Sequence, residues 1–175
     1  KSFLEEFIPF FQKQYDSIGS AEEEVHLVYK SQLNDSPFEQ LLIDFEKRDA
    51  FTRFSNAGTH KDDLVFQIKG HPVKKFGSQG QQKSFIIALR LAQYEWLKNH
   101  LGVLPVLLLD DIFDKLDHTR VQRLMKLVAK NFFGQVLVTD TDLNRVQRIF
   151  ADNDLESKLF EVSGDKVSEL NKIEV

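Results

Sequence analysis

The sequence contains no cysteine among its 175 residues. Disulfide bonds and thiolate metal sites are therefore excluded, and the composition fits a reducing compartment, so we expect a cytoplasmic protein. No apolar run approaches the roughly 20 residues that a membrane-spanning helix needs, and no signal peptide is visible, so we expect no membrane partner. The chain starts at Lys1, inside an amphipathic pattern. This start predicts a fragment whose N-terminal portion has been left out.

The sequence also has no excess of basic residues. It contains 27 acidic residues and 23 Lys and Arg, which gives a net charge of −4. This balance argues against a protein that coats nucleic acid generally, although a local basic surface is still allowed. The sequence shows no internal repeat, no low-complexity linker and no sustained heptads, which excludes long coiled-coil arms. Since 42% of the residues are hydrophobic, one domain with a real core, with or without a small appendage, is expected.

The first third of the chain predicts secondary structure and no chemistry. Aromatic and aliphatic residues recur at helical spacing over residues 1–18, and alternation predicts a strand within residues 22–33. Ser36 and Pro37 then predict the cap and first position of a second helix. The residues expected on its buried face are Phe38, Leu41, Leu42, Phe45 and Phe51. We divide the chain into a helical and strand appendage, residues 1–50, and a C-terminal lobe, residues 51–175.

From residue 77 onward, predicted strands alternate with predicted helices. The expected elements are a helix to about residue 99, a strand at 106–109, a helix at 118–130, a strand at 135–139, a helix at 143–151 and a hairpin at 158–170. Such alternation predicts βαβ units, a largely parallel sheet flanked by helices and therefore an α/β fold.

The apolar run 106–109 is followed by two adjacent acids, Asp110 and Asp111. A continuous apolar run predicts a strand buried on both faces, with the acids at its carboxyl end, where open α/β sheets bind ligands. Burying two carboxylates costs several kcal/mol unless a cation meets them. We therefore interpret the stretch as a Walker B strand, with Asp110 holding Mg²⁺ through water and Asp111 orienting or deprotonating the attacking water. Acids that merely end a strand are the structural alternative.

The glycine-rich stretch, residues 77–84, has three interpretations. It is one residue short of a Walker A loop, because Gln82 stands where the last glycine belongs, and the polar residues before it do not predict a central strand. The better interpretation is a variant of the ABC signature L-S-G-G-Q, in which small residues and a helix N-terminus let the backbone approach a phosphate. A turn that only caps an ordinary helix remains the structural alternative.

Residues 78–84 and 107–117, in this order and spacing, resemble the RecF family of bacterial DNA replication and repair proteins. Residues 58–64 resemble a further RecF landmark, G-P-H-R-D-D-L, with Thr59 and Lys61 as departures. The resemblance implies the C-terminal part of an ABC-type ATPase head related to the Rad50 and SMC heads. It also implies ATP and Mg²⁺ as cofactors, ATP-dependent homodimerisation and DNA binding near single-strand/double-strand junctions. Cooperation with RecO and RecR in loading RecA on gapped DNA is implied as well.

Carried over by position, the resemblance implies a role for each motif residue. Those expected at the γ-phosphate of ATP bound by the other subunit are Gly77, Ser78, Gln79, Gly80 and Gln81. Asp110 would be the metal acid, Asp111 the catalytic carboxylate and Asp117 the acid of the D-loop. Two departures stand out. The 175 residues contain no Walker A motif, and Asp140 and Thr141 occupy the place of the switch histidine.

Two expectations concern the remaining charged residues. Arg120, Arg123 and Lys130 lie on one predicted helix and could neutralise DNA phosphates. A charged, solvated helix face explains them better, so the expectation of DNA contact rests on the resemblance and not on charge. His60, a lone histidine before a strand, is expected to be structural.

Three function classes stay open. The first is an ATP-dependent DNA-repair protein, of which this piece would be inactive alone. The second is a non-catalytic scaffold on the same fold or another SMC-type head, and the third is a P-loop NTPase that uses residues 77–84.

Overall fold

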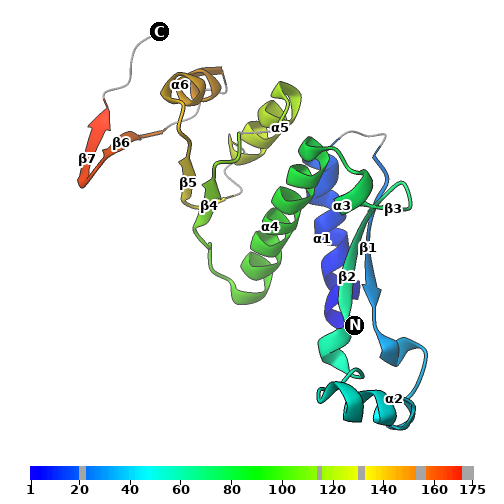
Figure 1. The fold of residues 1–175 in the computed structure, drawn as a ribbon. Coiled ribbons are helices and arrows are strands. Elements are labelled where there is room, and N and C mark those ends of the chain that lie inside the picture. Colours follow the sequence, from blue (N-terminus) through cyan, green and yellow to red (C-terminus); the bar gives the residue numbers. More distant parts are fainter. Residues whose placement is uncertain (20–22, 114–115, 130–132, 153–156, 171–175) are drawn as a thin grey trace. The chain divides into compact units, whose positions relative to one another are not determined.

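The computed structural model describes residues 1–19, 23–113, 116–129, 133–152 and 157–170. Their contacts divide the chain into two compact units, Lys1–Gln93 and Tyr94–Val175. The division falls within the longest helix, α4 (Gln79–Leu101) (Figure 1). The domain boundary expected near residue 50 from the sequence stays a prediction.

The first unit is built around a small antiparallel sheet. Strands β1 (Val25–Lys30), β2 (Asp63–Ile68) and β3 (His71–Pro72) pair in that order. Helix α1 (Ser2–Ile18) has its predicted extent. It buries the apolar stripe Phe7, Phe11, Tyr15 and Ile18. The rings of Phe11 and Phe66 lie 4.8 and 5.2 Å from that of Phe85 on α4, so α1, β2 and α4 share one aromatic core.

Helix α2 (Phe38–Thr52) differs from the prediction at its start and on its face. Its N-cap is Pro37 with no side-chain cap, so the prediction of Ser36 as the cap is wrong. Of the expected face only Leu41 is buried, and Phe51 is 89% exposed. Helical spacing determines which residues share a face, but burial needs a neighbouring element, and the described residues do not cover this face. The short helices η1 (Gln32–Asn34), η2 (Thr59–Lys61) and α3 (Val73–Phe76) complete the unit.

The second unit contains the predicted parallel pairing. Strand β4 (Leu107–Asp110) pairs in parallel with β5 (Val136–Thr139), and Asp110 lies opposite Thr139. Helix α5 (His118–Ala129) connects the two strands, and α6 (Leu143–Asp152) follows β5. The closing hairpin of β6 (Leu159–Ser163) and β7 (Lys166–Leu170) is antiparallel, as predicted. The unit's core includes Leu107, Leu109, Ile112, Phe113, Val121, Leu124, Met125 and Phe133.

Strand β4 is covered on one face only. Leu107 and Leu109 are buried, whereas Leu108 between them is 68% exposed and Leu137 on β5 is 49% exposed. The prediction of a strand buried on both faces is therefore wrong for this chain. Alternate side chains of a strand point to opposite faces, and the described residues supply a cover for one of them. Within these same residues, no helix is both long and apolar enough to span a bilayer.

Candidate functional site

The predicted signature segment, residues 77–81, joins α3 to α4. Gly77 ends α3, and its N–H donates to the carbonyl of Val73 at 2.8 Å. A Cβ at this position would lie 2.7 Å from that oxygen, closer than real Cβ atoms come. Only glycine therefore lets α3 turn directly into the signature segment.

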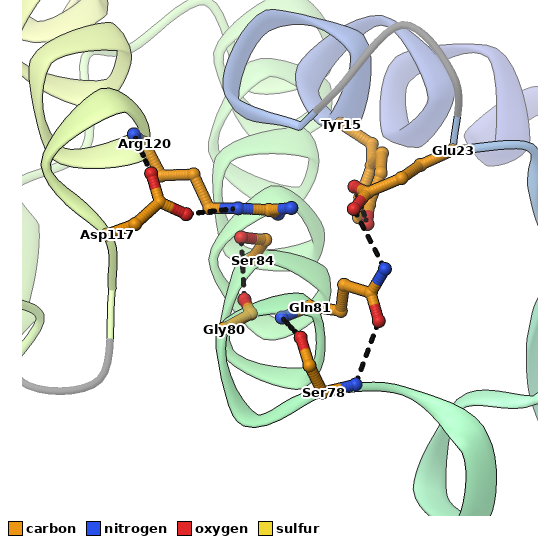
Figure 2. Close-up of polar contacts among 8 residues, drawn as sticks. All are labelled: Tyr15, Glu23, Ser78, Gly80, Gln81, Ser84, Asp117 and Arg120. Atoms are coloured by element: carbon orange, nitrogen blue, oxygen red, sulfur yellow. Dashed lines mark hydrogen bonds and ion pairs between the residues drawn. The ribbon is translucent and has the colours of Figure 1, made fainter.

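Ser78 caps α4 through a reciprocal pair of hydrogen bonds (Figure 2). The Gln81 backbone N–H donates to Ser78 Oγ at 3.2 Å, and the Ser78 N–H donates to Gln81 Oε1 at 2.8 Å. This arrangement is a capping box, which a Ser-x-x-Gln spacing encodes. Ser78 and Gln79 are exposed, and Gly80 and Gln81 are half-buried. The exposed start of a 23-residue helix therefore presents a serine and backbone N–H groups.

The segment before residue 77 decides against the Walker A interpretation. A phosphate-cradling loop of that kind follows a buried parallel strand. Here residues 77–84 follow the four-residue helix α3 and, before it, the two-residue edge strand β3 of an antiparallel sheet. The geometry is that of a capped helix start.

The acid pair, Asp110 and Asp111, lies at the carboxyl end of β4, as predicted. Both residues are exposed, so the expectation of a buried acid pair is wrong. The energetic argument that burial demands a cation therefore has no force for this chain. Asp111 instead has a positive φ of 46°, a left-handed backbone that few non-glycine residues adopt. Such backbone conformations concentrate at functional sites.

Thr139, which was not among the predicted site residues, forms hydrogen bonds with both acids. Its hydroxyl donates to Asp110 Oδ1 and accepts the Asp111 backbone N–H at 3.3 Å. Parallel pairing causes this contact, because β4 and β5 end at the same sheet edge. The sequence did carry a signal for this contact, because Thr139 is the polar last residue of the strand predicted at 135–139.

Carboxylate and hydroxyl oxygens can both coordinate Mg²⁺. Among the described residues, however, no group of three or more His, Cys, Asp or Glu could hold a metal. Mg²⁺ typically takes one or two carboxylates and completes its shell with water and substrate phosphates. Asp110 and its surroundings fit an ion held in that way and do not fit an all-protein metal cage.

Asp117 caps α5 and pairs with Arg120. Its carboxylate accepts the Arg120 backbone N–H and the guanidinium Nε, both at 2.9 Å. The Arg120 side chain is only 11% exposed. Because that guanidinium is engaged with Asp117, the geometry does not favour Arg120 as a DNA contact. Arg123 is exposed, and Lys130 lies outside the described residues.

The side chain of Asp140, at the predicted switch position, contacts the start of α6. Its side chain is 0% exposed, and Oδ1 accepts Arg145 Nη2 at 2.6 Å and the Asp142 N–H at 2.7 Å. Burial acts to raise the pKa of Asp140, but the Arg145 hydrogen bond and charge and the backbone N–H groups outweigh burial and lower it. Thr141 is exposed, so of the two predicted switch residues it is the one that a ligand can reach.

Within the landmark at residues 58–64, residues 58–62 form a turn that side-chain hydrogen bonds hold in place. Gly58 has a φ of 124° and donates its N–H to Gln32 Oε1 at 3.2 Å. The Tyr29 hydroxyl donates to Asp62, and His60 Nε2 bonds the Ser55 carbonyl at 2.9 Å. These contacts agree with the expected structural role of His60.

Solved structures share this fold. The recombination mediator RecF with ATPrS superposes with a TM-score of 0.70 over 97% of this chain and 45% of its own, at 22% identity. A structure from work on ATP-driven dimerisation and DNA-stimulated activation of SMC ATPases gives a TM-score of 0.56 over 98% of this chain and 89% of its own, at 16% identity. The chain therefore has the fold of an ABC/SMC-type ATPase head.

Sequence comparison finds relatives that share one name. The chain is 49% identical over 160 residues to the DNA replication and repair protein RecF of Flavobacterium johnsoniae, which covers 91% of the chain. It is 42% identical over 170 residues to RecF of Bacteroides thetaiotaomicron. Over the segment that it spans, the chain is therefore similar in sequence to RecF proteins.

No protein-family model matches the chain. The chain also spans about 45% of the length of the curated relatives that it matches.

Proposed function

We propose that this chain is part of an ATP-dependent DNA-binding protein of replication and recombinational repair. The 49% identity to a RecF protein is the observation that supports it most. The position of the two motifs agrees with it, one at the start of α4 and the other at the end of β4. The protein would act in the cytoplasm as an ATP-driven homodimer on DNA near single-strand/double-strand junctions. RecO and RecR would be its partners in loading RecA.

In this proposal the signature segment serves ATP held by the other subunit. The Ser78 hydroxyl and the backbone N–H groups of Gln79 and Gly80 would donate to the γ-phosphate. The N–H groups of Gly77, Ser78 and Gln81 already donate within the chain. The partial positive charge of the α4 N-terminus would add to this attraction. The residues act only when two subunits meet, so nucleotide binding by a monomer would not need them.

The acid pair would serve hydrolysis. Asp110, oriented by the Thr139 hydroxyl, would hold Mg²⁺, which when bound offsets charge on the phosphate oxygens. Asp111 would orient or deprotonate the attacking water. Asp117 would be the D-loop acid, and Thr141, or less directly Asp140, would respond to the γ-phosphate. Arg123 and Lys130 remain the proposed DNA contacts.

The full-length protein with two variants tests the proposal. We expect Ser78→Arg to block ATP-driven dimerisation in gel filtration, because added bulk and charge would meet the partner's phosphate, while the monomer still binds ATP. We expect Asp111→Asn to form the ATP dimer but to lose hydrolysis by about 100-fold or more. A Ser78→Arg protein that dimerises as the wild type does refutes the trans role of the signature segment.

The exposure of Asp110 and Asp111 favours a second candidate, a non-catalytic scaffold on this fold. A domain keeps exposed acids at little cost, so their presence alone does not require catalysis. The two candidates differ in one measurement. A full-length protein that neither binds nor hydrolyses ATP, with or without DNA, would support the scaffold.

A further inference from the structure

A chain of hydrogen bonds links the signature segment to α1 and to the residues before β1 (Figure 2). The Tyr15 hydroxyl donates to Glu23 Oε2 at 2.9 Å. Gln81 Nε2 donates to Glu23 Oε1 at 2.9 Å across 58 positions of sequence. The other end of the same amide, Gln81 Oε1, accepts the Ser78 backbone N–H. Glu23 therefore contacts one of the two side chains that form the α4 capping box.

The chemistry of these partners leaves Gln81 a single orientation. A primary amide has a donating end and an accepting end. The Ser78 N–H only donates, so it must face the amide oxygen, and the Glu23 carboxylate only accepts, so it must face the amide nitrogen. Glu23 thus fixes the amide that caps α4.

Glu23 is itself fixed by the core of the first unit. Tyr15 is 0% exposed. Its ring packs 5.4 Å from the ring of Phe85 and 6.0 Å from that of Phe11. Hydrogen bonds to an ionised acceptor are roughly twice as strong as neutral ones, so a carboxylate with two such donors is a firm anchor.

The resulting cap leaves Ser78 ready to donate. Its oxygen accepts the Gln81 N–H, and no described residue accepts its hydroxyl proton. An approaching phosphate oxygen is the kind of acceptor that would take that proton. An amide turned the other way would place Gln81 Nε2 against the Ser78 N–H and open the cap.

We propose that Glu23 is a positioning residue for the signature segment. Through Gln81 it holds the Ser78 cap in the form that meets the phosphate of ATP on the partner subunit. The role of Glu23 toward ATP on the partner subunit rests on the proposed function. The hydrogen bonds from Glu23 through Gln81 to Ser78 concern only the first unit.

The test uses the full-length protein with Glu23→Lys, and with Glu24→Lys as a matched control. An ammonium cannot accept the Gln81 N–H, so it disfavours the observed amide orientation. Glu24 has the same charge and is next in sequence, but its carboxylate bonds the exposed His26 at 3.1 Å. Glu23→Gln keeps an acceptor for Gln81 and is the conservative rescue.

Three measurements follow for each protein. In Glu23→Lys we expect the Ser78 amide to exchange with solvent about tenfold faster without ATP. We also expect the midpoint of ATP-driven dimerisation to rise about tenfold, while ATP affinity of the monomer is unchanged. Glu24→Lys should match the wild type in all three, and Glu23→Gln should lie close to it.

Unchanged Ser78 exchange in Glu23→Lys, or equal effects in Glu24→Lys, would overturn the inference. If Glu23→Lys fails to fold, Tyr15→Phe removes one hydroxyl and should still speed exchange at Ser78, and an unchanged rate there would also overturn it. A wild-type protein that does not dimerise with ATP would refute the proposed function instead. The exchange measurement would still decide the role of Glu23.

Discussion

At the scale of single residues, hydrogen bonding rather than burial distinguishes the acid pair. The expected cost of burial is absent, because Asp110 and Asp111 are exposed. Thr139 instead bonds Asp110 through its hydroxyl and accepts the Asp111 N–H. Together with the positive φ of Asp111, these bonds fix the Asp110 carboxylate and the Asp111 backbone at the end of β4. In the proposed function, orientation is the property that Asp110 as metal ligand and Asp111 as general base would need most.

Asp140 makes a pH prediction possible. Its pKa is lowered in the folded chain, so its contribution to stability is complete above the unfolded value near pH 4 and is lost as the pH falls through the lower folded value. We expect Asp140→Asn to reduce the free energy of unfolding by about 1–3 kcal/mol at pH 7, because Arg145 loses its ionised partner. The deficit should shrink below about pH 4.

Thermal unfolding between pH 3 and 7 measures this difference. Asp142→Asn is the control. In the structure the Arg145 backbone N–H donates to Asp142 Oδ1 at 3.1 Å, and the asparagine amide keeps an oxygen that can accept it. A deficit for Asp140→Asn that stays constant with pH would contradict the assignment.

At the scale of elements, three successive helices begin in a related way. Helix α4 starts with Ser78 and Gln81, α5 with Asp117 and Arg120, and α6 with Asp142 and Arg145. In each case an oxygen of the cap residue accepts the backbone N–H three positions later, which satisfies a donor that the helix itself cannot pair. The proposed signature and D-loop residues are therefore helix caps as well.

The α5 cap allows a prediction that separates capping from charge. We expect Asp117→Ala to lower the free energy of unfolding by about 0.5–2 kcal/mol, because the Arg120 N–H loses its acceptor. Asp117→Asn should cost less, since the amide oxygen still accepts that N–H. The lost ion pair is worth under about 1 kcal/mol because the Asp117 side chain is 57% exposed. Urea unfolding measures both, and equal losses would show that the ion pair dominates.

At the scale of the whole molecule, the chain presents one bare face of a parallel sheet. Val106, Leu108 and Leu137 are 52%, 68% and 49% exposed. The relatives are about twice as long as the matched segment. We expect the remainder of a full-length protein to cover this face and to supply the phosphate-cradling loop that these 175 residues lack.

The isolated chain should therefore be inactive. We expect it neither to bind ATP tightly nor to hydrolyse it, because in the proposed function the signature segment would act on a partner's nucleotide and because no stretch of the 175 residues matches the Walker A pattern. Calorimetric titration with ATP and Mg²⁺ and a phosphate-release assay measure both properties. Robust hydrolysis that Asp111→Asn abolishes would show that the phosphate-binding loop lies within the chain after all. Loss of ATP affinity in Lys83→Ala would then identify it as residues 77–84.

The sequence by itself determined the order of helices and strands after residue 77, the parallel pairing of β4 with β5 and the positions of both motifs. Periodicity and chain order are local, so they can be predicted without a structure. Only the tertiary structure decided that β4 is covered on one face, that Thr139 orients Asp110 and that Glu23 holds Gln81. Each of these depends on which distant residues meet, and spacing along the chain does not specify that.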